Sequence, residues 1–299
     1  MNALVFGCGY LGRPVATALI AQQYQVHALT RSQERADQLA ADGIRPIQGD
    51  WTRPGDLTNL PRVDRILVAV AYDRKSGMDR ETATVTGFRN ALRATNPQAD
   101  LVYISTTGVY HQSDGEWVNA SSPANPISDG GQAHLRAEQV LRDERGDGHP
   151  WVILRLAGIY GPNRIPRAAD VIAGREISGD PDGWLNLIHV DDAVSAILAA
   201  WEKTPNKNPD SDSGLSITRQ RCYAVSDGHP MRRRQFYQEI ARQTGSPQPR
   251  FITSAASPSQ TQRATSNKRV DNSDVLRDLD FSWQAPDYRR GLELVLRRD

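Results

Sequence analysis

Short apolar runs alternate with longer amphipathic segments through the first two-thirds of the chain. The apolar runs predict strands at 2–7, 25–31, 44–50, 65–72, 100–110, 151–161 and 221–227, and the periodic segments predict helices at 13–23, 32–43 and 78–95. Because a parallel neighbour needs a crossover connection, this alternation indicates βαβ units. The nearly unbroken apolar run at 66–71 is typical of a strand covered on both faces. The pattern therefore predicts an α/β fold with a doubly wound parallel sheet.

The last third of the chain has a different pattern. Polar stretches rich in proline and serine occupy 204–216 and 246–266, and helical periodicity appears at 232–245 and 273–280. Loops of this length in a compact domain are usually functional or mobile. The late apolar run at 221–227 is expected to return to the main sheet, so the early and late parts of the chain should interleave.

Composition limits the classes of partner. The 299 residues suggest about two folding units, and 36 Lys and Arg against 35 Asp and Glu give no electrostatic case for nucleic acid or an anionic membrane. Two cysteines provide no disulfide framework, and no segment has the apolar length of a signal sequence or a membrane span. No cysteine–histidine cluster has metal-ligand spacing. We therefore expect a cytoplasmic protein whose partner is a small molecule, and a homodimer is left open.

A Gly-x-Gly-x-x-Gly sequence follows the first predicted strand directly and opens the first predicted helix. Its glycines are Gly7, Gly9 and Gly12. In this context the first glycine allows a tight turn, the second lets the backbone approach a pyrophosphate, and the third permits close packing of helix against strand. The helix N-terminus would add N–H donors and a positive dipole end for the phosphates. We expect a dinucleotide site here, which includes Tyr10 and Leu11.

The end of the second predicted strand indicates which dinucleotide binds. NAD sites place an acidic residue about 20 residues after the glycines, where it accepts hydrogen bonds from the ribose. This chain has Arg31 and Ser32 in that region instead. An arginine makes charge-assisted contacts with a 2′-phosphate, which favours NADP(H). The alternative is a surface arginine beside the next helix, and NAD(H) is left open.

Two further segments are expected to line the cofactor. Asp50, followed by Trp51, ends the third predicted strand, where its carboxylate could meet the adenine amino group. Ala69, Val70 and Ala71 end the fourth strand and would run beneath the cofactor. Both segments have a structural alternative, since an aspartate also caps turns and an apolar run also fills a core.

Segments along the whole chain resemble landmarks of the extended short-chain dehydrogenase/reductases, the nucleoside-diphosphate-sugar epimerase/dehydratase group. They occur in the family's order as "ALVFGCGYLG", "GDWT", "LVYISTTGVY", "ILRLAGIYGPNR", "NLIHVDDAVSAILAA" and the closing stretch at 267–296. The resemblance implies a Rossmann core at 1–160, rejoined by 187–228. It also implies a small substrate-side domain formed by 161–186 and 229–299.

The family's chemistry rests on four positions, which the resemblance carries over one at a time. The hydroxyl that polarises the substrate oxygen falls on Thr106. The helical asparagine falls on Thr84, and the Tyr-x-x-x-Lys pair falls on Gly130 and His134. A glycine cannot transfer a proton. His134 has a suitable pKa for proton transfer and could hydrogen-bond the nicotinamide ribose, but a single helical histidine is more often a solvated or packing residue.

Other residues could contact the substrate or replace the missing acid. Tyr110 is the further catalytic candidate, and the expected substrate contacts are Thr107, Tyr160, Asn163 and Arg164. The sequence thus predicts an NADP(H)-binding oxidoreductase or epimerase-like protein that lacks the Tyr-x-x-x-Lys pair. Its substrate would be nucleotide-sugar-like or a small carbonyl or hydroxyl compound. The alternative is a non-catalytic NADP(H)-binding redox sensor or regulator.

Overall fold

The computed structural model describes residues 1–203, 221–252 and 267–296, and its backbone contacts divide the chain into two compact units. The first unit comprises 1–105, 132–154 and 196–223, and the second comprises 106–131, 155–195 and 224–299. This division differs from the expected domain boundaries by assigning 106–131, 155–160, 187–195 and 224–228 to the second unit. Of the polar stretches predicted as loops, all of 204–216 and the part of 246–266 from residue 253 onward lie outside the described residues.

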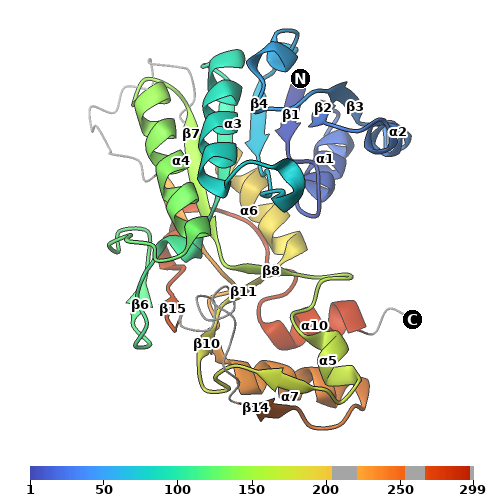
Figure 1. Cartoon of the computed structure of the whole chain (residues 1–299), viewed down its shortest axis with the longest axis vertical. Helices are drawn as coiled ribbons and strands as arrows, with labels where there is room; N and C mark the ends of the chain where they lie inside the picture. Colours follow the sequence, from blue (N-terminus) through green and yellow to red (C-terminus); the bar gives the residue numbers. More distant parts are fainter. Residues whose placement is uncertain (204–220, 253–266, 297–299) are drawn as a thin grey trace. The chain divides into compact units, whose positions relative to one another are not determined.

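Seven strands form the central sheet, in the order β12-β7-β5-β4-β1-β2-β3 (Figure 1). Their bounds are β1 Asn2–Phe6, β2 Gln25–Thr30, β3 Arg45–Gln48, β4 Arg65–Val68, β5 Asp100–Thr106, β7 Trp151–Leu156 and β12 Cys222–Val225. β1 pairs in parallel with both β2 and β4, and the β2–β3 and β4–β5 pairs are also parallel. The strand order reverses at β1 and β4, which is the Rossmann arrangement. The predicted fold class is confirmed.

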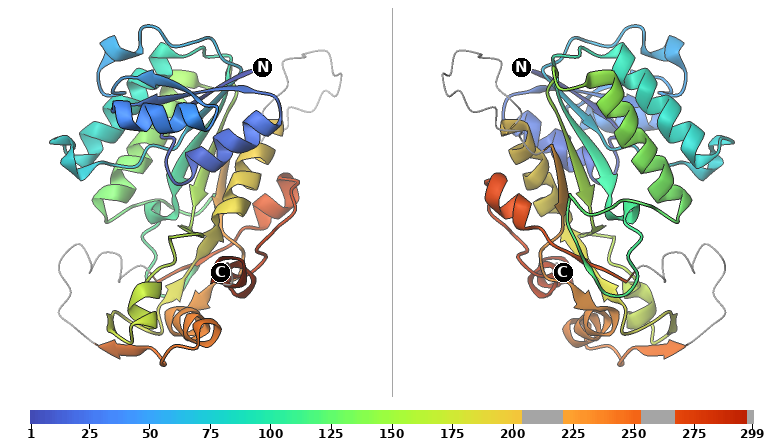
Figure 2. Two further views of the ribbon diagram at one scale, coloured as in Figure 1. Left: turned by 90° about the vertical axis from the view of Figure 1, so that its right-hand side faces the viewer. Right: turned by 90° about the vertical axis from the view of Figure 1, so that its left-hand side faces the viewer.

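Helices cover both faces of this sheet. They are α1 Gly12–Ala21, α2 Gln33–Ala41, α3 Arg80–Ala94, α4 Asp129–Arg145 and α6 Val190–Glu202. Figures 1 and 2 show α3 and α4 side by side on one face and α1 and α6 on the other. Phe88 of α3, Leu101 of β5 and Leu141 of α4 belong to one buried core cluster. The helices predicted at 13–23, 32–43 and 78–95 are confirmed, with ends shifted by one or two residues.

All seven predicted strands were longer than the observed ones, and the largest differences lie at 65–72, 100–110 and 151–161. β5 ends at Thr106 because Thr107–Val109 turns into the short 3₁₀ helix η3. The run at 151–161 is divided between β7 and β8 (Gly158–Tyr160), and β4 ends at Val68. The 3₁₀ helices η1 (Pro54–Leu57) and η2 (Arg74–Ser76) follow β3 and β4. The strands therefore end where polar loops begin, which is where ligands bind in sheets of this kind.

The second unit contains short paired strands and helices around its own core. Its strands are β6 Trp117–Val118, β8 Gly158–Tyr160, β9 Glu176–Ser178, β10 Trp184–Leu185, β11 Leu187–His189, β13 Met231–Arg232, β14 Arg250–Ile252 and β15 Arg269–Val270. Its helices are α5 Ala168–Ile172, α7 Arg233–Thr244, α9 Ser273–Asp278 and α10 Tyr288–Leu296. The pairs are β10–β13, β11–β8, β14–β9 and β15–β6. The predicted helices at 232–245 and 273–280 are confirmed as α7 and α9.

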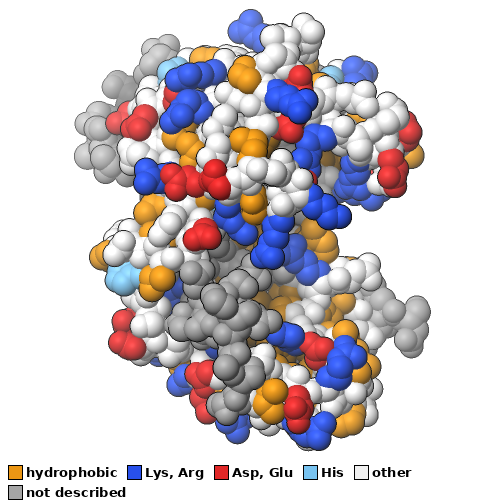
Figure 3. Space-filling view, in the orientation of Figure 1, with side chains coloured by type: hydrophobic (Ala, Val, Ile, Leu, Met, Phe, Trp, Pro, Cys, Tyr) orange, Lys and Arg blue, Asp and Glu red, His pale blue; other side chains and the backbone are white. Residues whose placement is uncertain are grey.

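The distribution of charged side chains on the surface is consistent with the near-zero net charge of the chain. Basic and acidic side chains are interspersed over the face of the first unit that Figure 3 shows. Within the described parts of the chain, no helix is long and apolar enough to cross a membrane.

Candidate functional site

The three glycines of the loop after β1 differ in the space around them. A Cβ added to Gly7, whose φ is +90°, would lie 2.4 Å from the carbonyl oxygen of Ala69, and one added to Gly12 would lie 2.3 Å from the carbonyl oxygen of Gly7. A Cβ on Gly9 would meet nothing within 4 Å. Two glycines are therefore required by packing, whereas Gly9 faces open space, as expected of a glycine kept for close approach of a ligand.

The loop leads directly into the N-terminus of α1. Leu11 is the N-cap residue of this helix, and no side chain caps it. The first N–H groups of a helix have no partners within the helix, and the dipole makes this end positive. Burial raises the pKa of the Cys8 thiol to about 11, so the thiol stays neutral. Leu11 is buried as well, and Tyr10 is half-buried. The N–H of Gly9 itself donates to the Gly7 carbonyl oxygen at 2.8 Å, so an anion at this loop would be met by the dipole and the first turn of α1.

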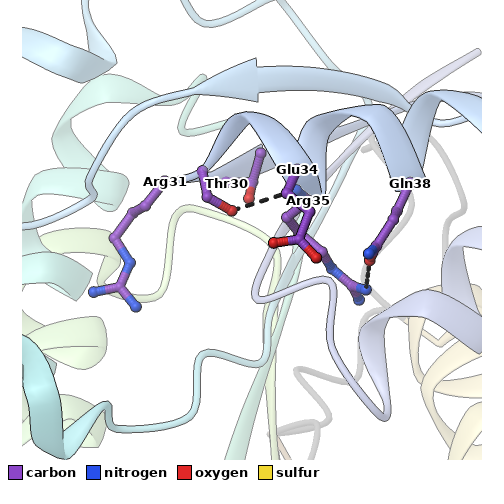
Figure 4. A pocket seen from close by; sticks show the side chains of 6 residues that line it. Thr30, Arg31, Glu34, Arg35 and Gln38 are labelled. Carbon is purple, nitrogen blue, oxygen red and sulfur yellow. Dashed lines mark hydrogen bonds between the residues drawn. The ribbon is translucent and has the colours of Figure 1, made fainter.

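A polar hollow of about 570 Å³ opens at the end of β2 (Figure 4). Its lining residues are Thr30, Arg31, Ser32, Glu34, Arg35 and Gln38. Two of these residues carry positive charge and one carries negative charge. In Figure 4 the Arg31 side chain points away from Arg35 and Gln38. The positive charge that lines the hollow therefore comes from Arg31, directly after β2, and from Arg35 in α2.

Arg35 is a site residue that the sequence pattern did not reveal. Its Nη2 donates to the carbonyl oxygen of Cys8 at 2.8 Å, and its Nη1 donates to Gln38 at 2.8 Å. Arg35 thus ties the first turn of α2 to the glycine-rich loop. Ser32 is the N-cap of α2, since its hydroxyl accepts from the backbone N–H of Arg35 at 3.3 Å.

A second hollow adjoins Arg31 on the side of β3. It is lined by Arg31, Gln48, Gly49, Asp50, Arg53 and Asp56. Asp50 Oδ1 accepts hydrogen bonds from the backbone N–H and the hydroxyl of Thr52, at 2.9 and 2.7 Å. The carboxylate therefore caps a turn, as the structural alternative expected, and it also borders the hollow. Arg53 is a second basic residue that the sequence interpretation missed.

Trp51 packs into the first unit instead of opening toward a hollow. A Cβ on Gly87 of α3 would lie 2.2 Å from the indole ring of Trp51, so the ring lies flat against the helix at that glycine. The side chain of Asn90 donates to the Trp51 carbonyl at 3.0 Å. This geometry favours a packing role for Trp51 over its expected cofactor contact. Ala69 and Val70 are half-buried beside Gly7, and Ala71 is exposed.

The hydroxyls at the end of β5 differ in their surroundings. Ser105 donates to the fully buried Glu138 at 2.7 Å. Thr106 Oγ1 accepts from the backbone N–H of Gly108 at 3.0 Å, and Thr107 begins η3. A hydroxyl that accepts in this way keeps its own hydrogen for a second partner. Thr106 therefore retains a donor, as the expected contact with a substrate oxygen requires.

The first turn of α4 contains Gly130, the position that the resemblance matched to the family's tyrosine. Gly130 has no side chain, and its neighbour Gly131 is required by packing. A Cβ on Gly131 would lie 2.3 Å from the Gly108 carbonyl oxygen and 2.6 Å from Pro126. Ser128 caps this turn by accepting from the Gly131 N–H at 3.1 Å. The turn that contains Gly130 is thus packed tightly against the loop after β5.

His134 is a neutral hydrogen-bonding residue. Its Nδ1 lies 2.8 Å from the hydroxyl of Tyr103, and burial lowers the pKa of His134 to about 4. Burial also raises the pKa of Tyr103 well above its usual value, so both partners of this hydrogen bond are neutral. At neutral pH His134 carries no charge with which to lower the pKa of a tyrosine, as the family's lysine does.

The two tyrosines expected near the substrate are buried. Tyr110 is 3% exposed, and its hydroxyl accepts from Arg155 at 3.0 Å. Tyr160 is fully buried among Phe236 and other apolar residues, and a Cβ on Gly291 would overlap its hydroxyl. Burial raises the pKa of Tyr160. The geometry favours packing for both tyrosines over a catalytic or substrate role.

Asn163 and Arg164 form a tight turn after β8. The backbones of Gly161 and Arg164 bond each other in both directions, at 3.0 and 3.2 Å. Asn163 has a φ of 61°, which asparagine tolerates better than most residues. The turn explains why an asparagine stands at position 163, since the backbone there has a positive φ. The side chains of Asn163 and Arg164 are both exposed. Within the ranges that the structure describes, no group of three or more His, Cys, Asp or Glu could hold a metal.

The chain is similar to a protein family, to characterised sequences and to solved structures. The profile of the NAD dependent epimerase/dehydratase family matches residues 3–211. Protein YeeZ of Escherichia coli K12 is 27% identical over 304 residues, which cover 95% of this chain and 96% of YeeZ. The 4-hydroxy-2-methyl-3-oxo-4-farnesyl-3,4-dihydroquinoline-1-oxide ketoreductase of Stigmatella aurantiaca is 27% identical over 245 residues, which cover 77% of this chain and 69% of the ketoreductase. A conserved protein of unknown function from Silicibacter pomeroyi has a similar structure, with a TM-score of 0.77, 26% identity, and coverage of 99% of this chain and 98% of that chain.

Proposed function

The chain belongs to the NAD-dependent epimerase/dehydratase family, and on that premise we propose that it binds NADP(H) and transfers hydride between this cofactor and a small carbonyl or hydroxyl compound. The observation that carries the proposal is the glycine-rich loop, which is closed by packing at Gly7 and Gly12 and open at Gly9. This loop lies beside a hollow that contains Arg31 and Arg35.

The residues present fit the dinucleotide. The pyrophosphate would lie over Gly9 at the N-terminus of α1, where backbone N–H groups and the helix dipole favour an anion. The first hollow has two arginines against one glutamate, and the second has two arginines against two aspartates. The first is therefore the more positive and suits the 2′-phosphate. The second, with Asp50 at its border, suits the adenine. When bound, the nicotinamide supplies or accepts the hydride.

The chain's own residues would handle the substrate oxygen. Reduction of a carbonyl adds hydride to carbon and a proton to oxygen, and Thr106 keeps a hydroxyl hydrogen that can bond this oxygen. Because Gly130 has no side chain and His134 is neutral, the proton in this proposal would come from solvent water through the Thr106 hydroxyl, which would give its hydrogen to the substrate oxygen and take one from the water, leaving hydroxide to the solvent. The imidazole of His134 would instead hydrogen-bond a ribose hydroxyl of the cofactor, through an Nε2–H if the Tyr103 hydroxyl donates to Nδ1. The ketoreductase relative supports a carbonyl compound as the substrate.

A second candidate function is non-catalytic NADP(H) binding by a redox sensor or regulator. Two observations favour it: Gly130 stands where the family has tyrosine, and His134 is uncharged at neutral pH. Both functions use the same cofactor site. They differ in whether the Thr106 hydroxyl contributes to turnover.

NADPH oxidation measured against a panel of small ketones, aldehydes and nucleoside-diphosphate sugars tests the proposal. We expect turnover of at least one compound. Thr106→Ala should then reduce kcat by roughly 10²-fold, because a hydrogen bond to the developing oxyanion is lost. Thr106→Ser keeps the hydroxyl and is the matched control, which should retain most of the activity. Tight NADPH binding with no turnover across the panel would favour the sensor.

A further inference from the structure

An exposed ion pair joins the end of β2 to the loop after β4. Arg31 Nη2 lies 2.7 Å from Asp73 Oδ2. Asp73 is also the N-cap of η2, since its Oδ1 accepts from the backbone N–H of Lys75 at 2.9 Å. β2 and β4 are the two neighbours of β1 in the sheet. The pair therefore connects the segments that follow the two strands on either side of the glycine-rich loop.

Arg31 is the residue shared by the two hollows of the cofactor site. Its guanidinium already has an anionic partner in the carboxylate of Asp73. Both side chains are exposed to solvent, at 53% for Arg31 and 36% for Asp73. An ion pair this exposed is weak, so an incoming phosphate can compete for the arginine.

We propose that Asp73 is a specificity-determining residue of the cofactor site, whose carboxylate competes with the 2′-phosphate of NADP(H) for Arg31. This inference rests on the NADP(H) site proposed above. NADP(H) must draw Arg31 from Asp73 or share it with a second negative charge. NAD(H) has no 2′-phosphate, and its binding leaves the pair intact. Asp73 therefore lowers the affinity for NADP(H) without a matching effect on the affinity for NAD(H). As a result it reduces the preference for NADP(H) over NAD(H) that Arg31 and Arg35 create.

Asp73→Asn tests the proposal with little disturbance of the fold, because an asparagine side-chain oxygen can still accept from Lys75 and cap η2. We expect the variant to bind NADPH about two- to fivefold more tightly, the size of effect typical of an exposed ion pair. The NADH affinity should not change. The matched control is Asp37→Asn on α2, which removes the same charge from an exposed aspartate whose partner is Gln33. The control should change neither affinity.

Arg31→Gln and the double variant complete a cycle measured by calorimetric titration of both reduced cofactors at one salt concentration. Without Arg31, Asp73→Asn should tighten NADPH binding by much less than it does in the wild type. The inference is overturned if Asp73→Asn leaves NADPH affinity unchanged or weakens it, or if it tightens NADPH and NADH equally. It is also overturned if its effect persists in full without Arg31. A wild-type chain that binds neither cofactor would instead overturn the proposed function itself.

Discussion

Two glycines of the loop after β1 should respond to alanine in opposite ways. In Gly12→Ala the new Cβ would lie 2.3 Å from the Gly7 carbonyl oxygen and 3.2 Å from a methyl group of Val5. In Gly9→Ala the new Cβ would meet nothing within 4 Å, and Gly9 is not among the described glycines with positive φ. We expect Gly12→Ala to destabilise the fold. Gly9→Ala should fold normally and lose affinity for the cofactor.

The magnitudes follow from these distances. A carbon and an oxygen rest in contact at about 3.3 Å, so Gly12→Ala must move backbone by about 1 Å. Overpacking of this kind costs about 1–3 kcal/mol, which corresponds to a fall in Tm of roughly 2–12 °C for a chain of this size class. Gly9→Ala should change stability by no more than about 0.5 kcal/mol. The added methyl group would occupy space that the pyrophosphate needs. If this costs the binding free energy about as much as overpacking costs a core, the NADPH affinity should fall roughly tenfold or more.

Thermal unfolding with and without NADPH, followed by circular dichroism, separates the two effects. Wild type should gain Tm when NADPH is added, and Gly9→Ala should match the wild-type Tm without cofactor but gain little with it. A fluorescence titration of NADPH gives the affinities directly. The reasoning is refuted if Gly9→Ala binds NADPH as tightly as wild type, or if Gly12→Ala unfolds at the wild-type temperature.

Three further predictions concern charge. Arg35→Gln removes a cation from the first hollow and should weaken NADPH binding roughly tenfold, with a much smaller loss for NADH; equal losses in calorimetry would contradict the assignment. Burial lowers the pKa of His134 to about 4 from 6.5, so the unfolded state binds the extra proton and stability should fall as pH drops from about 6.5 to 4. In urea unfolding at pH 7 and pH 5, His134→Gln should lose less free energy of unfolding on acidification than the wild type does. Equal losses in the variant and the wild type would contradict a buried neutral imidazole. Burial raises the pKa of Asp227 to about 8 from 3.8, so the folded state holds the proton and stability should fall as pH rises from about 4 to 8. Asp227→Asn should flatten this decline in Tm, and an unchanged slope would show that Asp227 does not titrate in this way.

The parts of the site that the sequence predicted depend on short-range constraints. The spacing of Gly7, Gly9 and Gly12 after an apolar strand defines a local turn, and the structure gives each glycine a distinct environment. The fold class could be predicted for the same reason, since the alternation of strand and helix patterns already requires parallel crossovers. Arg31 follows its strand directly, and it borders both hollows.

The parts that the sequence did not predict depend on residues distant in the chain. Tyr160 ends a short strand as a substrate contact might, but Gly291 of α10 packs against its hydroxyl. Trp51 follows Asp50 as a cofactor contact might, but it packs against Gly87 of α3. Arg35 occupies a polar position of a helix, which resembles a solvated face until the contact with the Cys8 carbonyl is seen. Side-chain direction in each case is set by tertiary packing.

The most direct test of the central claim is the affinity of the full chain for NADPH and for NADH, measured by calorimetry under identical conditions at two salt concentrations. The account predicts that NADPH binds at least about tenfold more tightly, because Arg31 and Arg35 make charge-assisted contacts with the 2′-phosphate. The difference should narrow at higher salt, since the contacts are exposed. Equal or tighter binding of NADH would contradict the assignment of the hollow at the end of β2 to the 2′-phosphate.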